Sequence, residues 1–123
     1  MRRTRRRWHD GGATLWVPGR EEPVPLWIAA SYGSRRRGLL GRDGIEGALL
    51  LTPCGSVHTF GMRFAIDVAH LDRELRVLTV RTMVPGRLGA PRLRARHVLE
   101  SAAGAMARWG VRPGTALRVT PEA

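Results

Sequence analysis

Residues 66–84 read IDVAHLDRELRVLTVRTMV, and this stretch decides the fold. Its two halves, residues 66–71 and 75–84, are rich in valine, leucine and threonine, a composition that favours strands. Between them, Asp72-Arg73-Glu74 is typical of a tight turn. The stretch therefore predicts a β-hairpin whose second strand is the longest of the chain.

Shorter apolar segments lie on both sides of this hairpin, each bounded by proline, glycine or charged residues. They predict strands at residues 14–17, 24–30, 47–51, 57–64 and 116–120. In residues 57–64 the alternation puts four side chains on one face, where we expect them to pack in the core: His58, Phe60, Met62 and Phe64.

Residues 31–42 predict a helix of one or two turns, capped by Ser31 or Ser34 and ending near Gly41. Residues 85–96 are rich in arginine and proline and predict a loop.

The last third of the chain leaves two alternatives. Apolar residues recur at near-helical spacing over residues 92–109, which permits one helix. The other interpretation is a strand at residues 97–101 followed by a short helix at residues 103–109. Gly110 ends the helix in either case.

The chain has 123 residues, of which 43% are hydrophobic, and this fits one domain with a modest core. Many short strands without a regular alternation of strand and helix favour a mainly β (α+β) fold. We expect a small β-sandwich or barrel-like domain with one or two short helices. Five arginines precede Gly11-Gly12, so we expect a flexible basic arm at residues 1–12 and a single globular domain at residues 13–123.

The formal net charge is +11, and all 21 basic residues are arginine. An arginine-rich arm can bind phosphates non-specifically. No zinc-finger spacing, helix-turn-helix pattern or aromatic RNA-binding strand accompanies it. Nucleic-acid binding is therefore not expected beyond non-specific contact of the arm.

No apolar run approaches the roughly 20 residues that span a bilayer. The residues that follow the basic start, Trp8 to Gly12, are too polar for an export signal. We therefore expect no membrane association and a cytoplasmic location. The single cysteine, Cys54, excludes an internal disulfide and a multi-cysteine metal cage. The histidines show no ligand spacing, and we expect neither a metal nor a cofactor.

Four stretches between Ser34 and Pro121 share the order and sequence of a known family. They are RGLLGR at residues 37–42, VHTFGMRFAIDV at residues 57–68, Val98-Leu99-Glu100 with Ala103-Gly104, and GVRPG at residues 110–114. Together they resemble the bacterial and archaeal family known as domain of unknown function 192, in a branch with a Val-His-Thr-Phe-Gly-Met-Arg central motif. The resemblance implies a compact β-rich fold, supports a strand followed by a helix near Glu100, and implies no activity.

Two acidic residues occupy positions where an unpaired charge would be costly. Asp67 lies inside an apolar segment and Glu100 follows two apolar residues, so each needs a cationic or hydrogen-bonding partner. A guanidinium can hold a carboxylate with two parallel hydrogen bonds, which makes candidate partners of Arg37, Arg42 and Arg63. Either these groups form ion pairs that serve the fold alone, or they line one polar pocket and leave an arginine for an anionic ligand.

Our hypothesis is a domain that binds a small anionic or polar ligand, or a peptide, in a cleft. The cleft would be bordered by Arg37, Arg42, His58, Arg63, Asp67 and Glu100. One alternative is a hydrolase-like enzyme that uses His58 with Asp67 or Cys54. Four strand residues span about 13 Å, so contact between Cys54 and His58 would need a bend at Gly55. Another alternative is an interaction protein without a ligand pocket.

Overall fold

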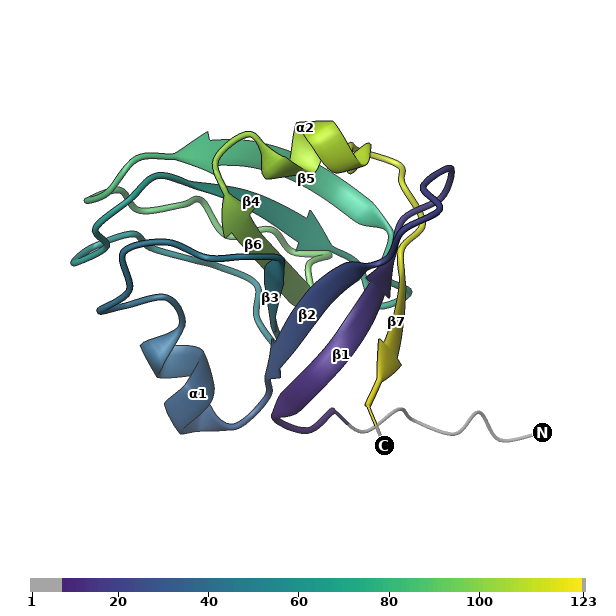
Figure 1. Ribbon diagram of the computed structural model, residues 1–123. Helices are drawn as coiled ribbons and strands as arrows, with labels where there is room; N and C mark the ends of the chain where they lie inside the picture. Colours follow the sequence, from purple (N-terminus) through teal and green to yellow (C-terminus); the bar gives the residue numbers. More distant parts are fainter. Residues whose placement is uncertain (1–7, 123) are drawn as a thin grey trace.

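The computed structural model describes residues 8–122, and within them strands dominate (Figure 1). The elements in chain order are β1 (Gly11–Trp16), β2 (Val24–Ala29), α1 (Tyr32–Arg37), β3 (Ala48–Leu51), β4 (Ile66–Leu71), β5 (Val77–Met83), β6 (His97–Ala102), α2 (Ala105–Trp109) and β7 (Arg118–Pro121). The mainly β fold with two short helices agrees with the sequence-based expectation.

The strands form one seven-stranded sheet in the order β5-β4-β6-β3-β2-β1-β7. Neighbouring strands are antiparallel except β2 and β3, which are parallel. A parallel pair needs a crossover connection, and here the crossover contains α1. This connection brings α1 beside the sheet, at the lower left of Figure 1.

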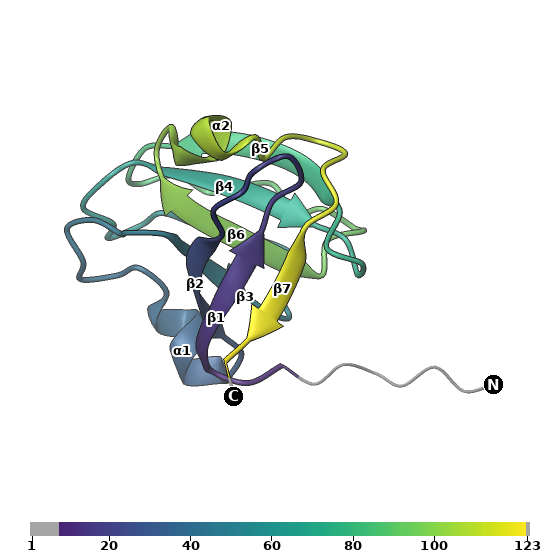
Figure 2. The same cartoon turned by 45° about the vertical axis from the view of Figure 1, so that its right-hand side comes forward.

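The sheet is open but curls towards a barrel. In Figure 2, β1 and β7 run steeply while β4 and β5 run nearly horizontally. Residues 114–117, just before β7, reach back to the start of β5. The Val77 N–H donates to the Thr115 carbonyl (2.9 Å), and the Leu117 N–H donates to the Leu75 carbonyl (3.1 Å). These bonds link the two outer regions of the sheet without closing it.

Apolar side chains pack on both faces of the sheet. The larger cluster includes Ala69 and Leu71 of β4, together with Met106 of α2. The smaller cluster includes Ile66 and Val68, which alternate with those residues along the same strand. The smaller cluster lies on the face that α1 approaches, because Leu39, just after that helix, belongs to it.

The expected strand at residues 57–64 is not formed; the segment makes one isolated bridge, between His58 and Leu88. Gly61 has φ +77°, which breaks the extended conformation. The buried Thr59 instead ties the segment to the loop after β5. Its hydroxyl donates to the Val84 carbonyl (2.7 Å) and accepts from the Arg87 N–H (2.8 Å).

Of the four side chains of residues 57–64 that were expected in the core, two are packed there and two are exposed. Met62 and Phe64 pack against the smaller cluster, as expected. His58 and Phe60 do not, since both are exposed. Half of the Phe60 surface (51%) remains accessible, because the turn at Gly61 directs the ring outward.

The other strands and both helices lie close to their expected positions. Ser31 caps α1 by accepting from the Ser34 N–H (3.2 Å), and the helix ends at Gly38, three residues before the expected position. In the last third, a strand followed by a short helix is the correct alternative. Gly110 ends α2 in the left-handed conformation, with φ +83°.

The folded region begins earlier than Ala13. β1 starts at Gly11, and Trp8 packs against the larger cluster. The expected arm therefore does not extend to residue 12, while residues 1–7 lie outside the described part of the chain.

Candidate functional site

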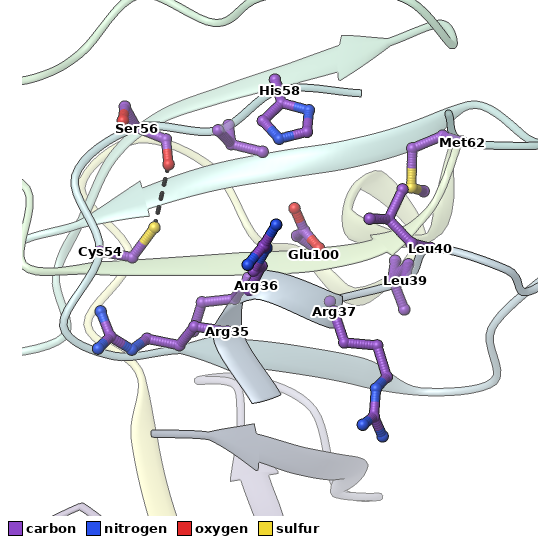
Figure 3. Close-up of a pocket in the computed structure, with 13 residues that line it drawn as sticks. Arg35, Arg36, Arg37, Leu39, Leu40, Cys54, Ser56, His58, Met62 and Glu100 are labelled. Atoms are coloured by element: carbon purple, nitrogen blue, oxygen red, sulfur yellow. Dashed lines mark hydrogen bonds between the residues drawn. The ribbon is translucent and has the colours of Figure 1, made fainter. Parts of the chain in front are cut away.

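A cavity of about 130 Å³ opens between α1 and the sheet (Figure 3). α1 and the turn after it provide residues 35–40, and β3 contributes Leu51. The loop between β3 and β4 provides Cys54, Ser56, Val57, His58 and Met62, and β6 provides Glu100. Four separate segments of the chain thus meet around this cavity, which we call the α1 pocket.

Asp10 fixes the helix that forms one wall. Its carboxylate accepts hydrogen bonds from the Ala30 N–H (2.6 Å), the Ser31 N–H (2.8 Å), and the hydroxyls of Ser31 (2.6 Å) and Ser34 (2.7 Å). These bonds, above all that from the Ser31 hydroxyl, hold the pKa of Asp10 far below its usual range. The residue before β1 therefore secures the start of α1 and, with it, the position of the pocket wall.

Glu100 lies at the bottom of the α1 pocket. Its side chain is only 5% exposed, and Figure 3 shows its carboxyl group directed into the cavity. Within residues 8–122, no hydrogen bond or ion pair to this carboxyl is found. Burial raises its pKa from 4.5 to about 7. A carboxyl group in this state lacks a donor, and the cavity beside it offers room for one.

Cys54 does not have the environment of a nucleophile. Its thiol donates to the Ser56 carbonyl at 3.0 Å, the contact drawn in Figure 3. Burial raises its pKa most; a backbone hydrogen bond with Ser56 opposes this, the charge of Glu100 raises the pKa again, and Arg35 lowers it slightly. The thiol therefore stays protonated at neutral pH, and a protonated thiol is a poor nucleophile.

His58 lies at the mouth of the pocket. Its Nδ1 accepts from the Phe60 N–H (3.2 Å), so the ring carries its proton on Nε2 when neutral. The ring stacks on Phe60 with a centroid separation of 5.2 Å. No hydrogen bond joins the side chains of His58 and Cys54, both of which belong to the described part.

Three arginines of α1 border the pocket. Arg35 donates from Nη1 to the Pro53 carbonyl (3.0 Å), while its buried Nε has no hydrogen-bond partner among the described residues. Arg36 and Arg37 are exposed. The guanidinium of Arg37 points away from Glu100 in Figure 3. The rim is consequently cationic, whereas the interior holds an acid.

Of the six residues predicted for the cleft, Arg37, His58 and Glu100 line the same pocket. Arg42 is exposed in the loop after α1 and does not line it. Arg63 forms an exposed ion pair with Asp43 (3.1 Å), also outside the pocket lining.

Asp67 belongs to the opposite face of the sheet, which corrects the expectation that it meets Glu100. Glu100 pairs with Val68, and side chains alternate along a strand, so Asp67 points the other way. There its carboxylate accepts from the Thr82 hydroxyl (2.7 Å) and from the N–H groups of Gly104 (2.9 Å) and Met106 (3.2 Å). It anchors the start of α2, and its partners are polar groups rather than arginines.

Sequence reasoning missed Arg35 and the apolar wall of the pocket. The wall consists of Leu39, Leu51 and Met62, whose side chains also belong to the smaller cluster. The run of three arginines at residues 35–37 can be seen in the sequence, but only the crossover between β2 and β3 brings it to the same pocket as Glu100. Among the described residues, no three His, Cys, Asp or Glu side chains gather as a metal site would require. None of the helices described is long and apolar enough to span a membrane.

The sequence of residues 14–119 matches DUF192, a family of uncharacterised ACR proteins. The chain belongs to the DUF192 family. The UPF0127 protein PH1112 of Pyrococcus horikoshii is 34% identical over 82 residues, which cover 63% of this chain and 71% of that protein.

Two solved structures share the fold of this DUF192 member. A protein of unknown function from Novosphingobium aromaticivorans is 19% identical, with a TM-score of 0.73 over 87% of this chain and 83% of that one. A Sinorhizobium meliloti protein, described provisionally as a transcription regulator, is 21% identical, with a TM-score of 0.75 over 88% of this chain and 92% of that one. At these identities the likeness concerns the fold alone.

Proposed function

We propose that this DUF192 protein is a binding module for a small polar ligand, which it holds in the α1 pocket between Glu100 and the arginines of residues 35–37. The observation that carries the proposal is the buried carboxyl of Glu100. Its oxygens face a cavity and receive no hydrogen bond from residues 8–122. A charge-assisted hydrogen bond from a bound donor is worth about 1.5–3 kcal/mol, and none of the described residues supplies one to this carboxyl.

The cavity limits the size of the ligand. Its volume of about 130 Å³ approaches that of an engineered protein cavity of about 150 Å³ that accepts benzene. A metabolite of a few carbon atoms, or one end group of a larger molecule, therefore fits the space. The binding would be non-covalent, with Glu100 and the arginines as the recognising groups.

The hydrolase alternative has less support. Asp67 is on the far face of the sheet from His58, and the Cys54 thiol is protonated and bonded to Ser56. A general base must lie within about 3.2 Å of the group it deprotonates, directly or through one water. Among the described residues, no hydrogen bond joins His58 to either Cys54 or Asp67.

A thermal-shift screen tests the proposal on the full chain. The panel contains small carboxylates, hydroxy acids, amines, amino acids and inorganic phosphate. A ligand at one hundred times its Kd stabilises a protein by about 2.7 kcal/mol, which raises the Tm by about 10 °C for a chain of this size. We expect at least one probe to raise the Tm of the wild type and to lose this effect in Glu100→Leu.

Two controls keep the result specific. Asp67→Asn changes an acidic residue on the opposite face and should retain the ligand effect. Arg42→Gln removes a nearby arginine that does not line the pocket, and it should also retain the effect. A panel in which no compound stabilises the wild type would contradict the proposal. The proposal includes the cytoplasmic location expected from the sequence, which cell fractionation would test.

A further inference from the structure

The two ends of the α1 pocket have opposite electrostatic requirements. At the inner end, the Glu100 carboxyl faces the cavity without a donor from the described residues. Three arginines line the rim, Arg35, Arg36 and Arg37, although the guanidinium of Arg37 points away from Glu100. Arg35 has a buried Nε–H without an acceptor among residues 8–122. A complementary ligand therefore carries a hydrogen-bond donor at the end that reaches Glu100 and a hydrogen-bond acceptor at the end that lies near the arginines.

The rim excludes a simple cation as the preferred ligand. An alkylamine could reach Glu100, but three guanidinium groups would repel its charge on the way in and in the bound state. A simple anion gains only at the rim, because it brings no hydrogen-bond donor to Glu100 and meets a like charge whenever that carboxyl is ionised. A molecule with both charges meets favourable groups at both ends, and its ammonium gives Glu100 a stronger hydrogen bond than a neutral hydroxyl does.

The wall between the ends is apolar. Leu39, Leu51 and Met62 line the cavity together with Val57. Methylene groups can pack against such side chains without loss of hydrogen bonds. The volume of about 130 Å³ has room for roughly four waters at about 30 Å³ each, which suits a short carbon skeleton.

We propose that the ligand of the α1 pocket is a small zwitterion of the amino-acid class, whose ammonium group binds Glu100 and whose carboxylate binds the arginines of α1. This inference rests on the proposed function and specifies its ligand. The two charges are separated by a short aliphatic skeleton that lies along Leu39, Leu51 and Met62. Charge-assisted hydrogen bonds at both ends give recognition that neither end provides alone.

Isothermal titration calorimetry on the full chain tests the charge requirement with matched probes. The zwitterions are glycine, β-alanine and γ-aminobutyrate, which vary the distance between the charges. Propionate and n-propylamine each carry one of the two charges, and lactate replaces the ammonium by a hydroxyl. We expect the best zwitterion to bind at least about tenfold more tightly than any single-charge probe, since one lost charge-assisted hydrogen bond is worth about 1.5–3 kcal/mol.

Three variants separate the two ends. Glu100→Gln should weaken binding of the zwitterion to about the level of propionate. Arg36→Gln removes one of the three arginines and should weaken binding severalfold, whereas replacement of Arg35, Arg36 and Arg37 together by glutamine should reduce it to about the level of n-propylamine. Arg112→Gln makes the same charge change near the end of α2, and we expect no effect on affinity. Circular dichroism and thermal unfolding verify that each variant is folded.

A proton balance gives an independent readout. Burial raises the pKa of Glu100 to about 7, so part of the population is protonated at neutral pH and capture of an ammonium group should release a fraction of a proton per ligand. The same titration in buffers of different ionisation enthalpy measures this number. The other ionisable side chains in the pocket are Cys54, His58 and the arginines, and Glu100→Gln identifies the part due to Glu100.

The outcomes distinguish this inference from the proposed function. If propionate or lactate binds as tightly as the best zwitterion, the zwitterion inference is wrong and the binding module stands. The same follows if a zwitterion binds without proton release, or equally well to Glu100→Gln. If no probe of either panel binds, both proposals fail.

Discussion

Replacement of Glu100 by glutamine should change how the stability of the protein depends on pH. Burial raises the pKa of this carboxyl from 4.5 in the unfolded chain to about 7 in the folded protein. Below pH 4.5 the group is neutral in both states and costs nothing. Above pH 7 it is charged in both states, and the folded state bears the cost of a buried charge. Stability therefore falls as the pH rises through this window.

The change in the free energy of unfolding follows from the shift of the Glu100 pKa between the unfolded and the folded state. Each pH unit between the two pKa values corresponds to about 1.4 kcal/mol, so the wild type should lose about 3 kcal/mol between pH 4.5 and pH 8 through this one group. Glutamine has nearly the same shape and does not titrate. The free energy of unfolding of Glu100→Gln, relative to that of the wild type, should increase by this amount across the window.

Urea unfolding followed by tryptophan fluorescence at half-unit pH intervals measures both curves. Glu21→Gln serves as the control, because Glu21 is exposed, and its curve should run parallel to that of the wild type. Parallel curves for Glu100→Gln and the wild type would show that the carboxyl has a partner or contact with solvent. The argument for the α1 pocket would then lose its main observation.

Substitutions at three further residues test other parts of the structure. Asp67→Ala leaves two backbone N–H groups and the Thr82 hydroxyl without their acceptor and should cost about 3–5 kcal/mol in urea unfolding. Asp67→Asn should cost about 1 kcal/mol, since an amide oxygen can accept from the N–H groups while its NH₂ donates to Thr82; equal losses for both variants would refute this geometry. Thr59→Val should destabilise by about 2 kcal/mol and increase amide exchange at Arg87, whose N–H loses its acceptor, and unchanged exchange would contradict the role of Thr59. Asp10→Ala should increase amide exchange at Ala30 and Ser31, whose N–H groups donate to the Asp10 carboxylate. Because the pKa of Asp10 is lowered, the difference from the wild type should shrink as the pH falls below 3.8, and a difference independent of pH would argue against these bonds.

The sequence predicted those elements whose signal is local. The hairpin of β4 and β5 follows from its apolar halves and polar turn. Periodicity left two alternatives open for residues 92–109, and the structure has the one that the family resemblance supported, a strand followed by a helix. Residues 57–64 alternate like a strand, yet the partner of Thr59 is a loop more than twenty residues away. A period of two in the sequence says nothing about whether a neighbouring strand is available.

Only part of the candidate site was predicted, because the sequence pattern does not show which segments become neighbours in the fold. Asp67 and Glu100 look alike in sequence, since each is an acid among apolar residues. Only the register, which pairs Glu100 with Val68, puts the two carboxyl groups on opposite faces. The role of Asp10 was missed because its partners lie at residues 30–34, beyond an intervening hairpin.

The contacts of Asp10 bear on how the protein should be prepared in the laboratory. The arginine-rich start invites truncation at Gly12, the end of the apparent tail, to improve crystallisation or reduce binding to nucleic acids during purification. Such a cut would delete the side chain that secures α1 together with the start of β1, and we expect it to weaken ligand binding. A shortened form should keep Trp8 and everything after it.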